Sequence, residues 1–351
     1  MNDTFSFTNT GECETPLSKG ELYFVSWWNL ENLFDIEGSP RRTEKLARTI
    51  KKEVKGWSEK ILNRKIAQIS QIISKMNGSN GPDILGVCEV ENRWVIEKLT
   101  DSLKRLHQHR YEIVHADTKD DRGIDVAFIY DAKKFEIEKN PTSGEKLIFS
   151  HFIMKREATR DILQVNLKTK ASDNRLVLIG NHWPSRSGGQ FESEPYRMIA
   201  GETSSYFHQR VLEENNKEEG GNTAILVMGD FNDEPFNRSV TDYLLATPSV
   251  LKVKQSKEAP RLFNLMWPIM ARGVGTFYYS NFANLLDQFM ISKGIVNGTK
   301  FKVKITDIVI FPEMVKGKYK HPVKFGRPSN KSLNEMGFSD HLPISIMVEE
   351  T

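Results

Sequence analysis

Short apolar runs that end on a polar side chain recur along this chain, and no other feature limits its fold as strongly. The run at 84–88 ends on Glu89, for example, and the run at 224–229 ends on Asp230. Apolar runs of this length are typical of strands that are buried inside a sheet. Six such runs deliver polar side chains at Asn29, at Glu89, at Asn181 and His182, at Asp230 and Asn232, at Asp287, and at Asp340 and His341. We therefore expect the ends of several buried strands to converge on one polar cleft.

The side chains at these strand ends are carboxylates, amides and imidazoles. Carboxylate and amide oxygens suit a hard divalent cation, and imidazoles beside it can serve as acids, bases or phosphate donors. Thiols have no part in this set, because the chain has only two cysteines. Cys13 lies in a polar stretch and Cys88 in an apolar strand, so we expect neither a disulfide nor a thiolate zinc site.

The composition is that of a globular protein, with 38% hydrophobic and 27% charged residues among 351. No apolar stretch approaches the roughly 20 residues of a membrane-spanning helix, so we expect no membrane insertion. The first residues lack the basic start and apolar core of a secretory signal. We therefore expect a cytoplasmic location, unless a leader has been removed.

The net charge of +3 is too small to identify a partner, but its distribution is uneven. Lysine and arginine gather at 41–60 and again at 316–331. Two basic segments beside a cleft would attract a polyanion such as nucleic acid. Solvated surface segments of the same composition are equally common, and both interpretations stay open.

The order of elements favours an α/β (α+β) fold, a four-layer sandwich in which two packed β-sheets are flanked by helices. Ile and Leu at helical spacing predict a helix over 58–76 that Ser58 caps. Further helices are expected near 92–107, 195–213 and 237–246. Residues 1–20 are expected to be a flexible tail and 21–351 a single catalytic domain. Strands are expected near 21–28, 84–88, 111–115, 125–130, 162–167, 176–180, 224–228, 275–279, 286–291, 301–310 and 343–348.

The motifs at the strand ends, taken in their order along the chain, carry a family resemblance. They read Trp-Trp-Asn-Leu-Glu-Asn around Asn29, Cys-Glu-Val-Glu-Asn around Glu89, Asn-His-Trp-Pro-Ser from Asn181, Gly-Asp-Phe-Asn from Gly229, Leu-Asp-Gln-Phe around Asp287, and Ser-Asp-His-Leu-Pro from Ser339. Over about residues 21–348 the chain resembles the endonuclease/exonuclease/phosphatase superfamily. That superfamily includes pancreatic-type deoxyribonucleases, abasic-site endonucleases, inositol-polyphosphate 5-phosphatases and neutral sphingomyelinases.

The resemblance implies a Mg²⁺ site, with Mn²⁺ or Ca²⁺ as alternatives. Mg²⁺ keeps most of its water and takes one or two carboxylates, and Glu89 at a strand tip is the strongest candidate ligand. The resemblance adds Asn29 and Asp340 to the metal site.

The catalytic set is expected to comprise His182, Asp230, Asn232, Asp287 and His341. If residues 230–232 are extended, Asp230 and Asn232 point into the cleft while Phe231 points into the core. Asp230 would then accept a proton from the attacking water or orient this water, and Asn232 would donate to a phosphoryl oxygen. The resemblance implies that Asp287 holds His341, with His182 as the second imidazole.

Three further residues are candidates near the cleft. Arg160 stands where the deoxyribonuclease branch has a phosphate-clamping arginine, although a surface ion pair is an equal alternative. Asn181 is a candidate substrate contact, and Asp125 a candidate partner for His182. The aromatic residues at 277–282 can stack on bases or sugars, or simply pack in the core.

These features favour a metal-dependent phosphodiesterase that hydrolyses nucleic acid, most simply DNA, through in-line attack of an activated water. The alternative is a phosphatase or a phospholipase C-type hydrolase acting on inositol phosphates or sphingomyelin. A non-catalytic binding module ranks last, because no residue of the cleft set is missing. Nucleic acid is the expected partner, and nothing indicates an obligate protein partner.

Overall fold

The computed structural model describes residues 20–107, 109–154, 159–215 and 222–351. Apart from Gly20, the tail expected at 1–20 lies outside these residues, as does Cys13.

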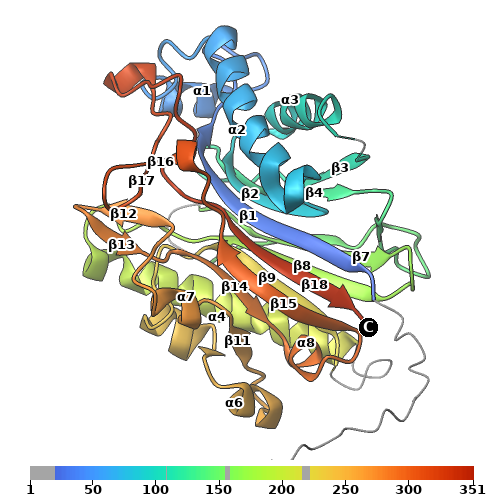
Figure 1. The fold of residues 1–351 in the computed structure, drawn as a ribbon. Helices are drawn as coiled ribbons and strands as arrows, with labels where there is room; N and C mark the ends of the chain where they lie inside the picture. Colours follow the sequence, from blue (N-terminus) through green and yellow to red (C-terminus); the bar gives the residue numbers. More distant parts are fainter. Residues whose placement is uncertain (1–19, 108, 155–158, 216–221) are drawn as a thin grey trace, which may run out of the picture.

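Two large β-sheets form the centre of the molecule (Figure 1). The first sheet has six strands in the order β15-β18-β1-β2-β4-β3. The second follows the order β10-β11-β14-β9-β8-β7-β5, with β6 paired to β7. The strands of the first sheet are β1 (Leu22–Leu33), β2 (Ile84–Val90), β3 (Tyr111–His115), β4 (Asp125–Asp131), β15 (Phe301–Ile308) and β18 (Ile344–Glu350). Those of the second are β5 (Phe135–Ile137), β6 (Ile148–His151), β7 (Ile162–Thr169), β8 (Arg175–His182), β9 (Ala224–Asp230), β10 (Ala246–Thr247), β11 (Leu262–Asn264) and β14 (Asp287–Ile291).

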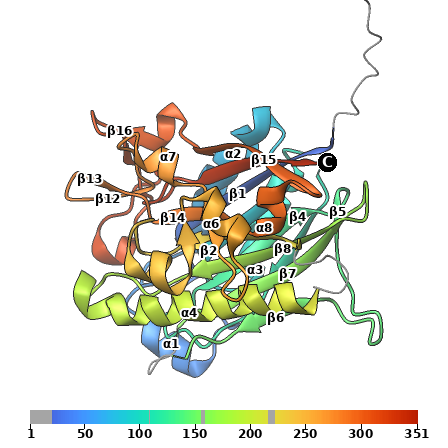
Figure 2. The ribbon, with the colours of Figure 1, turned by 90° about the horizontal axis from the view of Figure 1, so that it is seen from below.

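Helices cover the outer faces of both sheets, so the predicted four-layer sandwich is confirmed. Figure 1 shows α2 and α3 on the first sheet, and Figure 2 shows α4 running along the second. Ser58 caps α2 as predicted, accepting from the Ile61 amide. The helix expected at 237–246 is instead a short π-helix. The helices are α1 (Glu44–Ile50), α2 (Glu59–Ser79), α3 (Arg93–Lys104), α4 (Gln190–Glu214), η1 (Ser239–Tyr243), α6 (Val250–Gln255), α7 (Trp267–Met270), α8 (Lys293–Asn297), η2 (Pro312–Met314) and η3 (Pro328–Asn330).

Two small hairpins complete the fold. One joins β12 (Phe277–Tyr279) to β13 (Phe282–Asn284), and the other joins β16 (Val315–Lys316) to β17 (His321–Pro322). The expected strand at 275–279 is thus the first arm of a hairpin outside the large sheets. Among the described residues, no helix is both long and apolar enough to cross a membrane.

Strand direction brings the predicted polar residues to one edge of the sandwich. β1 runs parallel to β2, and β8 runs parallel to β9, so each pair ends at a common edge. β14 runs antiparallel to β9 and begins there, with Asp287 paired to Asp230. The loop before β18 is tied to β1, because Trp28 Nε1 donates to the His341 carbonyl at 2.9 Å and Ser339 Oγ to the Asn29 carbonyl at 2.7 Å.

Glycines allow large side chains to fill the space between the sheets. Trp27 lies over Gly86, where a Cβ atom would come within 2.4 Å of the indole ring and 3.2 Å of Met228 Sδ. At Gly180 a Cβ would come within 2.8 Å of the Phe128 ring. Because protein interiors are close-packed, the distance between the sheets depends on these small residues.

We predict that Gly86→Val lowers the free energy of unfolding by about 1–3 kcal/mol, because the added methyl groups overlap the fixed Trp27 ring. Gly86→Ala should give a smaller loss. Urea unfolding followed by circular dichroism measures both. An unchanged midpoint for Gly86→Val would show that the sheets are not closely packed here.

Candidate active site

Asn29, in the last part of β1, connects the two sheets at the cleft. Its Nδ2 donates to Asp230 Oδ2 at 2.9 Å and lies 3.4 Å from Glu89 Oε1. Its Oδ1 accepts the Glu31 amide at 2.9 Å. Carboxylates from two different sheets therefore gather around a single amide group, as the sequence predicts.

Irregular backbone turns these side chains into the cleft. Glu89 has a φ of 61° where the pairing of β2 shifts register, and Glu31 and Asn32 have φ values of 50° and 57° at the bulge in β1. Each left-handed, non-glycine residue costs about 1–3 kcal/mol and persists only where its surroundings hold it. The Asn32 amide donates to Glu89 Oε2 at 2.8 Å, so the two bulges stabilise each other.

Asp287 and His341 form a buried carboxylate–imidazole pair. His341 Nδ1 lies 2.7 Å from Asp287 Oδ2, and its Nε2 lies 3.8 Å from Asp230 Oδ2. Burial alone would lower the pKa of His341, but the charges of Asp287 and Asp230 outweigh it and raise this pKa well above its usual value. The structure thus brings together the pair that the family resemblance implies, with His341 charged.

His182 is the second imidazole of the cleft and has the opposite charge state. Its Nε2 lies 3.8 Å from both Glu89 Oε1 and Asp230 Oδ2. Burial lowers its pKa well below the usual value, and the positive charge of Arg160 lowers it further. His182 is therefore neutral while His341 is charged, so the two imidazoles are suited to different roles.

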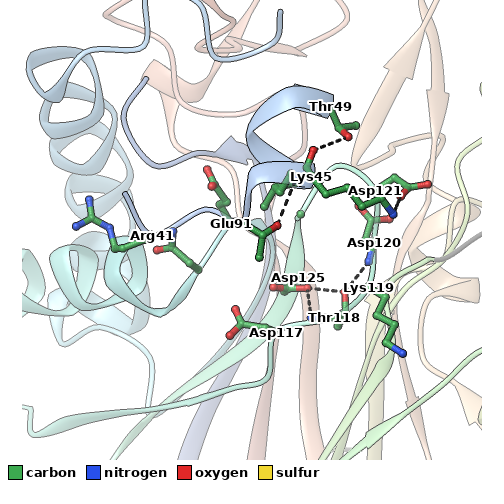
Figure 3. A pocket seen from close by; sticks show the side chains of 14 residues that line it. Arg41, Lys45, Thr49, Glu91, Asp117, Thr118, Lys119, Asp120, Asp121 and Asp125 are labelled. Carbon is green, nitrogen blue, oxygen red and sulfur yellow. Dashed lines mark hydrogen bonds and ion pairs between the residues drawn. The ribbon is translucent and has the colours of Figure 1, made fainter. Parts of the chain in front are cut away.

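Asp125 does not orient His182, which corrects that expectation. Its carboxylate accepts from the Thr118 hydroxyl at 2.6 Å and lies 3.2 Å from His115 Nε2. Figure 3 shows Asp125 bonded to Thr118 in a separate cavity of about 440 Å³ between α1 and the loop before β4. These contacts with Thr118 and His115 hold the Asp125 side chain in that cavity, so it does not contact His182.

Asp230 and Asn232 both lie at the cleft, but residues 230–232 are not extended. The strand ends at Asp230, and Asn232 has a φ of 50°. The Asn232 amide donates to Asp230 Oδ1 at 3.0 Å, and its Nδ2 donates to the Trp183 carbonyl at 3.0 Å. Phe231 is buried edge-on against Trp183, as the sequence predicts. Burial raises the pKa of Asp230 to about 6 despite the nearby His341 charge.

Asn181 has a structural position, which corrects its assignment as a substrate contact. The side chain is fully buried on the α4 side of β8, opposite His182. Its Oδ1 accepts from Trp183 Nε1 at 3.0 Å and from Ser204 Oγ at 2.5 Å. No part of the amide is left to meet a substrate.

Arg160 forms an ion pair, one of the two alternatives that the sequence leaves open, but the pair is buried rather than on the surface. Its Nη1 lies 3.3 Å from Asp120 Oδ2, and its Nη2 donates to the Trp183 carbonyl at 2.7 Å. Its Nε is buried without a hydrogen-bond partner in the described part of the chain. The guanidinium also lines a cavity of about 470 Å³ beside the cleft, so it can meet a ligand there.

Two charged residues at the cleft, Glu31 and Lys65, are missing from the sequence prediction. The Glu31 carboxylate accepts the Phe325 and Gly326 amides at 2.8 and 3.0 Å. Burial and the neighbouring Asp340 raise its pKa to about 7. Lys65 is fully buried and donates to the Glu31 carbonyl. The sequence contained a signal for each of these two residues. Glu31 follows Asn29 by two positions, and Lys65 is a charged residue on the apolar face of the 58–76 helix.

Acidic and histidine side chains gather in several places that could hold a cation. Four groups of three are found among the described residues. Two share Asp230: one adds Cys88 and His182, the other Asp287 and His341. The third group, Asp83 with His109 and Asp131, lies at the ends of β2 and β4 that are far from Glu89 and Asp125. The fourth group, His115 with Asp117 and Asp125, lies beside the cavity of Figure 3.

A second cavity beside the cleft lies on the side of Asp340. It encloses about 620 Å³ and is lined by both small hairpins. Asp340 lines this cavity, and Arg160 lines the 470 Å³ cavity next to Trp183. The strand-end residues therefore adjoin two hollows, one through Arg160 and the other through Asp340.

Comparison with known proteins agrees with this geometry. Residues 24–350 match the sequence profile of the Endonuclease/Exonuclease/phosphatase family. A search of the curated proteins found no match.

Solved structures share the fold at low sequence identity. A mannosyl-6-phosphatase from Bacteroides thetaiotaomicron is 15% identical with a TM-score of 0.53, covering 93% of this chain and 99% of that one. The human Nocturnin catalytic domain with bound sulfate is 17% identical with a TM-score of 0.51, covering 94% and 95%. Truncated TDP2 from Caenorhabditis elegans is 16% identical with a TM-score of 0.53, covering 94% and 99%.

The position of Asn181 leads to a prediction about stability. Asn181→Ala leaves the Trp183 and Ser204 donors without their acceptor, which should cost about 1–3 kcal/mol of unfolding free energy. Thermal unfolding measures this loss. A variant of full stability that instead binds substrate more weakly would restore the substrate contact expected from the sequence.

Proposed function

The chain belongs to the endonuclease/exonuclease/phosphatase family of phosphoester hydrolases, and we propose that it is a metal-dependent phosphodiesterase that cleaves nucleic acid, with DNA as the first candidate. The observation that carries this proposal is a pair of cavities that adjoin the His182–Asp230–His341 centre, one lined by Arg160, whose charge acts on His182, and the other by Asp340, which precedes His341. A phosphodiester has a group to place on each side of its phosphorus, whereas a monoester has one.

The residues of the centre have different roles in hydrolysis. Asp230, whose raised pKa suits a general base, accepts the proton of the attacking water. His341, held charged by Asp287, donates to a phosphoryl oxygen through Nε2. His182 is neutral. Arg160, which lines the neighbouring cavity, binds a phosphate oxygen of the substrate through its guanidinium.

The carboxylates of the cleft fit a divalent cation. Glu31, Glu89 and Asp340 lie around the buried cation Lys65, Asp340 also faces the charged His341, and burial raises the pKa values of Glu31 and Asp340. Oxygen donors in excess of positive charge are what Mg²⁺ or Mn²⁺ requires. Glu89 and Asp340 would hold the ion, with Asn29 and Glu31 beside them. Once bound, the ion would neutralise charge on the phosphoryl oxygens.

A phosphomonoesterase is the second candidate, because one protein with this fold is named a mannosyl-6-phosphatase. A panel with Mg²⁺ distinguishes the two: bis(p-nitrophenyl) phosphate, p-nitrophenyl phosphate, DNA and RNA oligonucleotides, an inositol phosphate and sphingomyelin. We expect turnover of the diester and the oligonucleotides. Turnover of monoesters alone would refute the proposal.

Asp287→Asn should lower kcat on bis(p-nitrophenyl) phosphate by about 10²-fold or more, because His341 loses the charge that fixes its ring and keeps it protonated. Asp125→Asn is the matched control, since Asp125 is also a buried strand-end carboxylate next to a histidine. Equal losses in both variants, after correction for folded fraction, would contradict the role of Asp287.

Removal of divalent cations with a chelator should abolish activity, and Mg²⁺ or Mn²⁺ should restore it. Glu89→Gln should raise the Mg²⁺ concentration for half-maximal activity by roughly 10-fold or more, because a ligand charge is lost. Glu136→Gln, an exposed carboxylate on β5, serves as control. Full activity in excess chelator would exclude the metal.

A further inference from the structure

The hairpin of β12 and β13 carries two large apolar side chains that are exposed in the described part of the chain. Ser280 and Asn281 have φ values of 47° and 70°, as in the tight two-residue turn that favours a hairpin. Tyr279 pairs with Phe282 across this turn, and the two are 72% and 75% exposed. Exposed aromatic pairs of this kind often mark binding sites.

The aromatic side chains on this face of the hairpin start next to His341, the catalytic histidine. Side chains two residues apart along a strand share a face, so Phe277 lies on the side of β12 that carries Tyr279. The Phe277 ring lies 4.9 Å from the His341 ring. An aromatic surface therefore extends from His341 through Phe277 to the pair at the tip.

The second hairpin packs against the opposite face of β12, and it brings positive charge to the base of the aromatic surface, because Phe277 also lines the cavity between the hairpins. Tyr278 packs on His321 of β17, with 4.8 Å between the rings. Lys316 and Lys324 line the 620 Å³ cavity between the hairpins, whose only acidic lining residue is Asp340. In the described part of the chain, neither lysine forms an ion pair with a carboxylate. Both lysines are exposed, and although the charge of Lys324 also acts on Asp340, both can meet an anion.

We propose that the two hairpins form a subsite for single-stranded nucleic acid next to the scissile phosphate. An unpaired base stacks on Tyr279 and Phe282, while the neighbouring phosphates meet Lys316 and Lys324. This inference rests on the proposed phosphodiesterase function and names its substrate class. Aromatic side chains beside a basic groove bind single strands through base stacking and phosphate contacts, largely without sequence preference.

Single strands fit this surface better than duplexes or membranes. Bases in a duplex already stack on one another and offer no free face to an aromatic side chain. Membrane insertion favours a larger apolar area than one aromatic pair, and the cavity beside it is polar and cationic.

The test compares two 12-residue single strands of equal charge with full-length protein and Mg²⁺. One is oligothymidylate, and the other carries abasic tetrahydrofuran units in place of the nucleosides. We expect wild-type kcat/KM to be about 10-fold or more higher for oligothymidylate, since stacking stabilises each bound base. The double variant Tyr279→Ala/Phe282→Ala should lose this preference. Tyr206→Ala, an exposed aromatic on α4, should keep it.

A lysine variant tests the charged half of the subsite. Lys316→Gln should weaken the salt dependence of kcat/KM on both strands, lowering the slope of the log–log plot by about 0.7. The preference for oligothymidylate should survive in this variant.

The outcomes separate this inference from the function on which it rests. Equal wild-type rates on the two strands, or a preference that survives in the double variant, overturn the subsite and leave the phosphodiesterase standing. A double variant that loses binding to phosphatidylserine vesicles but keeps its preference for bases likewise overturns the subsite. Failure to cleave either strand or bis(p-nitrophenyl) phosphate refutes the function itself.

Discussion

The close packing of the two sheets is the constraint on which the site depends. Asn29 comes from one sheet and Asp230 from the other, yet their side chains are 2.9 Å apart. Gly86 and Gly180 contribute to this close approach, because they leave room for large rings between the sheets. The positions of the strand-end residues are fixed by the buried strands that carry them. The cleft is therefore as rigid as the close-packed core. The left-handed backbone of Glu89 is held in the same way, by a hydrogen bond from the neighbouring bulge.

Charge compensation explains why so many ionisable groups can be buried together. An isolated buried carboxylate is costly, and each one here has a partner or a raised pKa. Asp287 is balanced by His341, and Asp230 by its amide donors and the same imidazolium. The carboxylates on the Asp340 side have Lys65 as a buried counter-charge, and Asp340 also faces the charged His341. This imbalance marks where a further positive charge belongs, and substrate phosphate would enter beside it.

The sequence predicted the elements and the members of the site better than their local geometry. Buried strands that end in polar residues determine which edge those residues share, so Glu89, Asp230 and His341 could be brought together from sequence alone. Side-chain direction at the strand ends could not, because bulges and left-handed residues reverse it. Asn181, in contrast, faces α4 by ordinary strand alternation opposite His182, and Asp125 binds its own neighbours. The basic segments were ambiguous for a similar reason. At 41–60, Arg41 and Arg42 form ion pairs with Asp35 and Glu91, whereas in 316–331 two lysines line the cavity between the small hairpins.

The central claim is that residues from strands far apart in the sequence hold one divalent cation at the meeting point of the two sheets. Anomalous scattering from crystals grown with Mn²⁺ tests it directly. The account predicts one strong peak within about 2–2.5 Å of a Glu89 carboxylate oxygen, with Asp340 at the same ion. A peak at Asp83, His109 and Asp131 with none in the cleft would contradict it.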